Sequence, residues 1–420
     1  MRRGRSALCA LCLALLAPML IHAARVLPTD RRSLAAEKYA GWSGVLRLWV
    51  CEGWPAGSGS LSAWLNSCIA RFEKRHPGVY VQPQAVDAEA LAAFSEDGIL
   101  PPDLLLFSPG TVDGPRGLMP LEPPAGLRAD LASCGAWGGG TYAVPVAMGG
   151  YLWAWNAALA DALPEDWRET ELTLAAPLPE AGRRFDAALL ALCSRTRGAS
   201  GAPGRPEPPG LDLGLEPEAT PEPTAAPEAA LPCRLPEDFA PDGDAFRRFL
   251  NGEAAATVVT QREVRRLQAL SEQGRGPDWR LSADGGAFTD QLLCLAAVDK
   301  PEAQIALCQD FLSTLLEDES QAALSGAGAF GVTDAPSGYA AADPLALLDA
   351  KLRQPGLAAP NCLRKNWPEN TELIVRKFLS GDGDSPALWR ALAAALKENP
   401  NIISDSGSVC GEITSPKSPI

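Results

Sequence analysis

The stretch that decides the fold ends in Tyr142-Ala-Val-Pro-Val-Ala-Met-Gly-Gly-Tyr151, within a segment that runs from Leu46 to Asn156. This segment reads, in order, as a strand, an amphipathic helix, a second strand and a short buried strand. Strands that alternate with helices predict an α/β sheet with right-handed crossovers. The segment therefore predicts two α/β lobes with a ligand-sized cleft between them.

The first elements follow from local patterns. A strand is predicted over 44–50, where side chains alternate, and a Gly- and Pro-rich loop follows it over 51–60. Apolar residues at helical spacing predict a helix over 61–75. The apolar run 101–107 has the length of a buried parallel strand. Ligands of such sheets lie at the carboxyl ends of strands, so the loop 51–60 and residues 108–111 are predicted to line the cleft.

The same patterns predict the rest of the chain. Further strands are expected at 79–83, 142–146, 151–155, 254–260 and 288–298, and helices at 88–95, 185–194, 244–250, 263–272, 301–316 (continuing over 317–326), 340–353, 372–379 and 387–398. Residues 197–231 are dominated by Pro, Gly, Ala and Glu and predict a disordered insertion in a surface loop. Residues 401–420 predict a flexible tail.

The N-terminal residues 1–24 predict export. Arg2, Arg3 and Arg5 form a basic region, and the apolar run Ala7 to Ile21 is about 15 residues long, which is short for a membrane span and typical of a signal peptide. The cleavage site that Ala23 and Ala24 offer is mediocre. An uncleaved N-terminal anchor therefore stays open as the alternative. Either reading places the chain outside the cell or at the cell surface.

Composition narrows the chemistry. The net charge of −14 and the pI of about 4.8 argue against binding to nucleic acid or to an anionic membrane surface. His22 and His76 are the only histidines of the sequence. Serine-hydrolase triads, His-rich zinc sites and most general-base chemistry thereby lose their usual residue. We expect no catalytic residues, no metal and no cofactor.

The cysteines are scattered along the chain. There are eleven, and nine remain if the signal is removed; no CxxC spacing occurs outside the apolar N-terminal run. A metal cage is thus not expected, and an odd number cannot pair completely. The favoured interpretation is buried thiols that act as small hydrophobic side chains. One or two disulfides stay open, and the spacing does not assign them.

Seven short motifs resemble, in order, those of the extracellular solute-binding proteins of the large carbohydrate-type class that serve ABC importers. They cover about residues 45–335. The motifs are Leu46-Arg-Leu-Trp49, Phe72-Glu-Lys-Arg-His-Pro-Gly-Val-Tyr-Val81, Pro102-Asp103-Leu-Leu, Tyr142-Ala-Val-Pro145 with Trp155-Asn156, Leu163-Pro-Glu-Asp-Trp167, Phe249-Leu-Asn-Gly-Glu-Ala-Ala255, and Pro301-Glu-Ala with Phe311-Leu and Gln321. The chain departs from the family pattern in the insertion after Arg197, the missing lipobox and the apolar character of the loop 51–60.

The resemblance implies a two-lobed, periplasmic-binding-protein-like (type II) α/β fold with a hinge and an interlobe cleft. Lobe 1 would comprise 44–146 plus 285–320, and lobe 2 would comprise 147–284 plus 321–400. The chain would cross near Val146–Gly150, where the glycine pair suits hinge dihedrals; an ordinary turn stays open as the alternative. It implies a monomer that captures a small polar solute, most plausibly a sugar, and hands it to the permease subunits of an ABC importer. Contact with the membrane would be limited to an N-terminal anchor.

Two other classes of function stay open. One is a degenerate solute-binding-like module that binds a protein or envelope component without small-molecule transport, which the three departures favour. The other is a glycosidase with a carboxylate pair, for which no particular pair stands out. Screening with sugars separates the first class from the solute-binding protein.

Candidate ligand contacts follow from the predicted strand ends and the crossing. Sugars are bound by aromatic faces together with polar side chains that orient hydroxyl groups. The candidates on this basis are Glu52, Trp54, Ser108, Thr111, Met148, Tyr151 and Gln261. For each of them the alternative is an ordinary place in the core or in a solvated loop.

Overall fold

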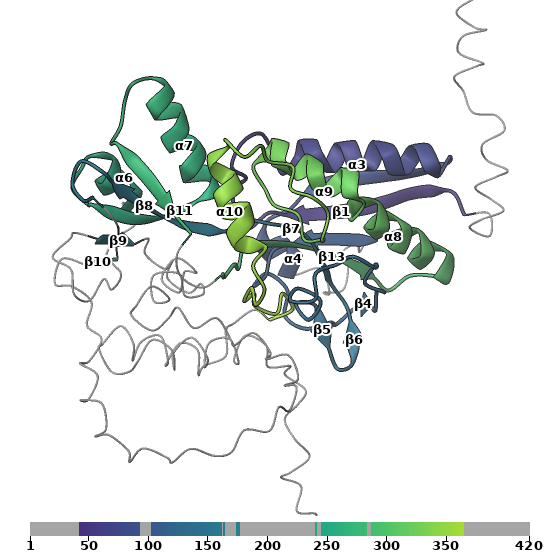
Figure 1. The fold of residues 1–420 in the computed structure, drawn as a ribbon. Helices are drawn as coiled ribbons and strands as arrows, with labels where there is room; N and C mark the ends of the chain where they lie inside the picture. Colours follow the sequence, from purple (N-terminus) through teal and green to yellow (C-terminus); the bar gives the residue numbers. More distant parts are fainter. Residues whose placement is uncertain are drawn as a thin grey trace, which may run out of the picture.

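The structure is a computed structural model that describes residues 42–92, 102–161, 163, 174–176, 240–241, 245–283 and 287–364. These residues form two lobes, each built on its own β-sheet, with helix α10 beside the place where the lobes meet (Figure 1). Several predictions lie outside the described residues. They are the N-terminal segment 1–24, the helices at 185–194, 372–379 and 387–398, the insertion 197–231 and the tail 401–420.

Lobe 1 is built on a six-stranded sheet. Its strands are β1 (Gly44–Cys51), β2 (Val79–Ala85), β3 (Leu104–Phe107), β4 (Leu118–Met119), β7 (Val144–Met148) and β13 (Leu292–Val298). The order is β2-β1-β3-β13-β4, with β7 also paired to β13. β1 runs parallel to β2 and β3, as the strand–helix alternation predicts, whereas β13 runs antiparallel to β3, β4 and β7. The sheet is therefore mixed, and its central strands are apolar because helices and loops cover both faces.

The first helix of lobe 1 has the predicted limits. α3 (Leu61–Arg75) begins where the Ser60 side chain accepts a hydrogen bond from the Ser62 N–H, and it ends at His76, before the Pro-Gly pair. It packs against α8 (Glu302–Leu315), α9 (Asp318–Ala323) and the 3₁₀ turn η3 (Leu324–Ala327). The short α4 (Ala88–Ala92) follows β2 and contacts β1. A hairpin of β5 (Ala136–Trp137) and β6 (Gly140–Thr141) completes the lobe.

The helix predicted to continue over 317–326 is broken in the structure. Glu317 has extended backbone angles (φ −60°, ψ 145°), so α8 ends before it and α9 starts after it. Residues 324–327 then tighten into the 3₁₀ turn, and Gly328 ends it with a left-handed φ of 67°. Glycine adopts that conformation without the steric cost that a side chain would add. The break turns α9 and η3 back onto α3.

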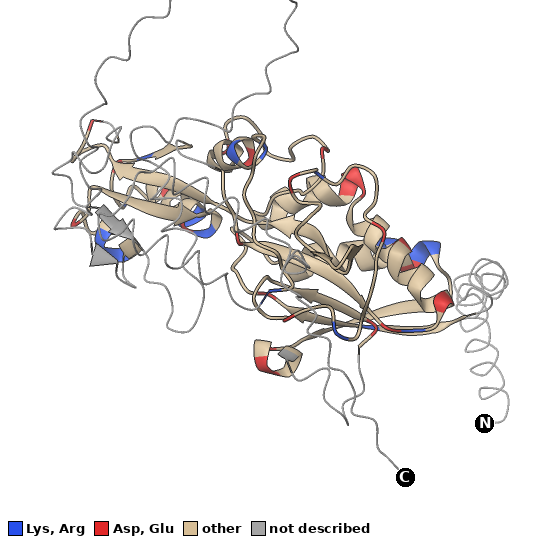
Figure 2. Cartoon of the chain, turned by 90° about the horizontal axis from the view of Figure 1, so that it is seen from below, with Lys and Arg blue, Asp and Glu red and all other residues tan. Residues whose placement is uncertain are grey.

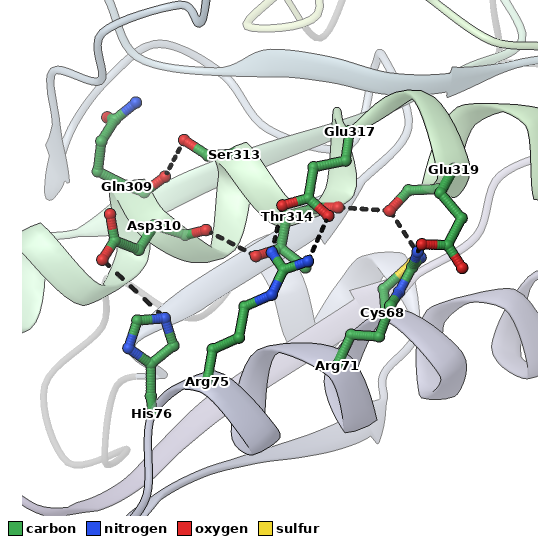
Figure 3. A network of polar contacts seen from close by, with 11 residues as sticks. Cys68, Arg71, Arg75, His76, Gln309, Asp310, Ser313, Thr314, Glu317 and Glu319 are labelled. Carbon is green, nitrogen blue, oxygen red and sulfur yellow. Dashed lines mark hydrogen bonds and ion pairs between the residues drawn. The ribbon is translucent and has the colours of Figure 1, made fainter. Parts of the chain in front are cut away.

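A polar network joins α3 to α8 and α9 (Figure 3). Arg75 makes two hydrogen bonds to the carboxylate of Glu317 near the surface. Arg71 is more buried; its Nη2 donates to Ser320 Oγ at 2.7 Å, and its Nη1 lies 2.9 Å from Glu319 Oε2. The indole N–H of Trp64 donates to the Ser320 carbonyl at 2.8 Å. Along one face of α3, the network therefore changes from an exposed ion pair, Arg75–Glu317, to buried hydrogen bonds around Ser320.

The two arginines give a matched pair of variants. Arg71→Ala should lower the free energy of unfolding by about 1–3 kcal/mol, because it leaves the fully buried Ser320 hydroxyl without its donor. Arg75→Ala should cost about 0.2–1 kcal/mol, because its partner Glu317 is solvated. Urea unfolding of both variants measures the difference. A larger loss for Arg75→Ala than for Arg71→Ala would contradict this ranking.

Lobe 2 is built on a five-stranded sheet. Its strands are β8 (Tyr151–Asn156), β9 (Leu174–Ala176), β10 (Ala240–Pro241), β11 (Ala256–Thr260) and β12 (Trp279–Ser282), in the order β10-β9-β11-β8-β12. α6 (Ala245–Leu250) packs on β9 and β11, and α7 (Gln261–Glu272) packs on β11. α7 begins one residue after β11, where the Glu263 carboxylate accepts the Thr260 N–H at 2.6 Å. This abrupt strand-to-helix turn places Gln261 at the edge of the lobe.

The path of the chain between the lobes differs from the prediction in its C-terminal part, after residue 320. It crosses between β7 and β8 at Gly149–Gly150 and again between β12 and β13, close to the expected positions. The predicted change to lobe 2 at residue 321 is wrong, because α9 and η3 stay packed on α3 and Phe330 pairs with Met148. α10 (Pro344–Leu352) does pack on a lobe 2 helix, α7. The chain returns to lobe 1 where the Cys362 N–H donates to the Cys134 carbonyl.

The described part of the chain carries charges of both signs on its helices and loops (Figure 2). Among the described residues, no helix combines the length and apolarity that a membrane span needs. Within the same residues, no group of three or more His, Cys, Asp or Glu side chains could hold a metal ion. The six described cysteines are all buried, as the interpretation as small hydrophobic side chains predicts. Cys193, Cys233 and Cys410 lie outside the described residues.

Candidate functional site

The candidate site is the junction of the lobes, and its centre is the amide of Gln261. This side chain is fully buried. Its Nε2 donates to the Pro55 carbonyl of lobe 1 at 2.9 Å and to Gln291 Oε1 at 2.7 Å, and its Oε1 accepts the Gly150 N–H at 3.0 Å. We call Gln261 and Gln291 together the glutamine clasp. It joins the N-terminus of α7, the loop after β1 and both crossing segments.

The two crossing segments are also bonded directly to each other. The Gly149 N–H donates to the Gln291 carbonyl at 2.7 Å. The Thr289 hydroxyl donates to the Gly149 carbonyl at 2.8 Å and accepts the Gln291 N–H at 3.0 Å. Thr289 is fully buried and Gln291 nearly so. These bonds satisfy backbone groups that would otherwise be buried without partners, so they fix the register of the crossing.

The glycine pair is required by close approach. Neither Gly149 nor Gly150 has a positive φ in this conformation. A Cβ on Gly149 would lie 2.2 Å from Gln291 Oε1, and one on Gly150 would lie 2.9 Å from Leu352 side-chain atoms. The absence of side chains lets the clasp and α10 close onto the backbone.

The predicted ligand loop 51–60 contacts other segments at residues 57–58, while half of its residues stay exposed. The Gly57 N–H donates to the Gly328 carbonyl at 3.2 Å, and the Ser58 N–H donates to the Ala327 carbonyl at 3.0 Å. A Cβ on Gly57 would lie 2.8 Å from the Gly328 carbonyl oxygen and 3.2 Å from that of Gln261. The loop therefore lies between η3 and the start of α7, at the junction where it was predicted, with its backbone bonded internally.

Four of the seven candidates, Glu52 among them, belong to the two strand-end loops, which lie next to each other. The Gly53 N–H donates to Ser108 Oγ at 2.9 Å, and Thr111 Oγ1 donates to the Ser108 carbonyl at 2.6 Å. Ser108 is buried, whereas Thr111 is half-buried. Trp54 is 7% exposed and its indole N–H donates to the Leu292 carbonyl at 3.1 Å. Its ring packs in the hydrophobic core, which was the alternative to a ligand contact.

The other three candidates lie at the crossing. Met148 is fully buried and is bonded through its backbone to Phe330. Tyr151 is 7% exposed, and its hydroxyl donates to Asp290 Oδ1 at 2.9 Å. Gln261 belongs to the clasp. Of all seven candidates only Glu52 is exposed, and partial desolvation raises the pKa of its carboxyl above the usual value. The structure thus brings the candidates to one junction and gives most of their polar atoms protein partners.

The sequence analysis missed the polar residues of the second crossing. Thr289, Asp290 and Gln291 each bond to the first crossing segment, to Tyr151 or to Gln261. They precede the entirely buried strand β13. Three polar residues directly before a seven-residue apolar strand are the signal that could have identified them.

Comparison with known proteins shows the fold. No protein-family model matches the sequence. A search of curated proteins likewise finds no match. Solved structures do match over most of their length. The cyclic α-maltosyl-1,6-maltose binding protein of Arthrobacter globiformis is 15% identical with a TM-score of 0.50, over 85% of this chain and 98% of that one.

Two further structures give the same result. The GacH receptor of Streptomyces glaucescens, solved unliganded and with acarbose, is 14% identical with a TM-score of 0.50, over 85% of this chain and 100% of its own. The maltodextrin binding protein of L. casei is 13% identical with a TM-score of 0.52, over the same shares of the two chains. The predicted two-lobed, periplasmic-binding-protein-like α/β fold is thereby confirmed.

Proposed function

We propose that the protein is a solute-binding protein that captures a small polar solute, most plausibly a carbohydrate, for import by an ABC transporter. The observation that carries the proposal is the arrangement of two α/β lobes joined by bonded crossing segments. Three solved proteins with this fold have names that describe maltose-type, maltodextrin or acarbose ligands. A fold of this kind works by hinge closure around a ligand, so binding is proposed and not catalysis.

The remaining parts of the proposal concern place and partners. The basic and apolar N-terminal segment supports export, either as a cleaved signal or as an anchor that tethers the chain to the cell surface. The permease subunits of an importer would then receive the solute. We propose that the chain acts as a monomer and needs neither metal nor cofactor.

Within the junction, Glu52 and Thr111 are the best placed of the candidates to contact a solute. Both belong to the adjacent strand-end loops and both retain exposed surface. A partly desolvated carboxylate such as Glu52 is a strong hydrogen-bond acceptor for sugar hydroxyls. Trp54, Ser108, Met148, Tyr151 and Gln261 would act behind them by holding the loops and the crossing in place.

A second candidate function is a degenerate binding module that presents its surface to a protein or envelope component. The glutamine clasp favours it, because Gln261 already ties lobe 2 to the Pro55 carbonyl of lobe 1 through protein atoms alone. The clasp would then hold the lobes in one arrangement permanently. The two candidates predict opposite results with sugars.

Thermal unfolding with a panel of sugars tests the proposal. A sugar such as maltose or maltotriose at 100 times its dissociation constant should stabilise the chain by about 2.7 kcal/mol and raise the midpoint by several degrees. Glu52→Gln should reduce the shift at equal sugar concentration, whereas Arg75→Ala, in the α3–Glu317 pair, serves as the matched control. If no sugar, amino acid or polyamine raised the unfolding midpoint, the first candidate function would be rejected in favour of the second.

A further inference from the structure

Cys134 and Cys362 lie next to each other although they are far apart in the sequence. The Cys362 N–H donates to the Cys134 carbonyl with an N–O distance of 2.7 Å. The N–O distance, the N–Cα bond and the fixed distance of about 2.4 Å from a carbonyl oxygen to its own Cα together place the two Cα atoms at most about 6.6 Å apart. Disulfides span Cα separations of about 4.4–6.8 Å. The backbone therefore already holds this pair at disulfide distance.

The segment around Cys362 is pinned to the same part of lobe 1 by other bonds. The Asn361 side chain donates to the Ala136 carbonyl at 2.8 Å, and the Gly114 N–H donates to the Leu363 carbonyl at 2.7 Å. Cys134 and Cys362 are 2% and 0% exposed. Both partners are thus held in place by hydrogen bonds of the flanking residues, which keep the two cysteines adjacent in the folded chain.

We propose that Cys134 and Cys362 form a structural disulfide when the chain folds in an oxidising compartment. One cysteine thiolate attacks an oxidised thiol compound, such as glutathione disulfide, and forms a mixed disulfide while one glutathione thiolate leaves. The second cysteine thiolate then attacks the protein sulfur and expels the other glutathione. Two protein thiols are oxidised, one glutathione disulfide is reduced, and the two thiol protons pass to the two glutathione thiolates.

The burial of Cys134 and Cys362 determines at which stage of folding the thiol–disulfide exchange can take place. Desolvation raises the pKa of the Cys134 thiol well above its usual value, and the neighbouring Cys362 raises it further. The thiolate is the reactive form, so the folded, reduced chain reacts slowly. The disulfide therefore forms during folding, before the segment 361–364 closes over Cys134. It would covalently staple that segment to lobe 1 at the point from which the chain continues to residue 365.

Peptide mapping of the full chain tests the disulfide without any variant. The protein is refolded in a glutathione redox buffer, its open thiols are alkylated in denaturant, and it is digested without reduction. We expect a cross-linked pair of peptides containing Cys134 and Cys362, lighter by two hydrogens than the reduced pair. Cys308, which is equally buried, should carry the alkyl group. Alkylation of both Cys134 and Cys362, or a bond from either to a different cysteine, would overturn the proposal.

A stability measurement gives an independent readout. Excess dithiothreitol should lower the unfolding midpoint of the oxidised wild type by about 5 °C or more, because the bond closes a long loop. Cys308→Ala should show the same shift, and Cys134→Ala should show none. An equal shift in Cys134→Ala, or none in the wild type, would count against the bond. If Cys134→Ala does not fold, the mapping of the wild type decides alone.

Discussion

Trp54→Ala should lower the free energy of unfolding by about 3–5 kcal/mol, the range expected for deleting a large buried aromatic side chain. The Trp54 ring is 7% exposed and belongs to the hydrophobic core of lobe 1. Its indole N–H also donates to the Leu292 carbonyl at the start of β13. The variant loses both the packing and the hydrogen bond. Urea unfolding followed by circular dichroism measures the change in midpoint at constant slope.

Two controls separate the contributions. Trp54→Phe keeps most of the apolar surface and loses only the bond to Leu292, so it should cost less than Trp54→Ala. Trp279→Ala should also cost less, because Trp279 is partly exposed and its indole bonds to Ser271 near the surface. An unchanged midpoint for Trp54→Ala together with weaker sugar binding would mean that the ring stands in an open cleft after all.

The elements of lobe 1 could be predicted because their signals are local. The apolar spacing over 61–75 and the Pro-Gly stop fixed α3, and the runs around Leu46 and Leu104 gave β1 and β3. The burial of Trp54 could not be predicted in the same way. Its loop is rich in Gly and Pro, which locally favours an exposed turn. The residues that cover the loop, 326–328 and the start of β13, are remote in sequence.

In the candidate site, too, the position of a residue follows from the local sequence, whereas its bonding partners come from distant segments. Gln261 was predicted to lie at the cleft because it follows a strand, and the structure places it at the junction. Its partners Pro55, Gly150 and Gln291 come from three distant segments, so no local pattern reveals that its amide is bonded within the protein. The same holds for residues 321–335, which stay in lobe 1 through contacts with the remote helix α3 and with Met148. The position of a residue in the fold is thus easier to predict from sequence than the identity of its hydrogen-bonding partners.

Gly149→Ala should open the junction and lower the free energy of unfolding by about 1–3 kcal/mol, as overpacking of a buried site does. The new Cβ would lie 2.2 Å from Gln291 Oε1 and 2.7 Å from Gln261 Nε2, so both amides of the clasp must move. Moving Gln261 breaks its bonds to Pro55 and Gly150 together. Amide hydrogen exchange should therefore become faster at Gly150, whose N–H the clasp holds.

A second substitution shows whether the clasp carries the effect. The double variant Gly149→Ala/Gln291→Ala lacks Gln291 Oε1, the atom closest to the new Cβ. It should therefore be more stable than the double variant would be if the two single losses simply added. Gly326→Ala serves as the control, because a Cβ there meets nothing within 4 Å. An unchanged exchange rate at Gly150 in Gly149→Ala would mean that the junction does not depend on the clasp. The same would follow if the double variant lost as much free energy of unfolding as the two single variants together. The contacts between Gly57 and Gly328 would then be what holds lobe 1 and α7 together at this point.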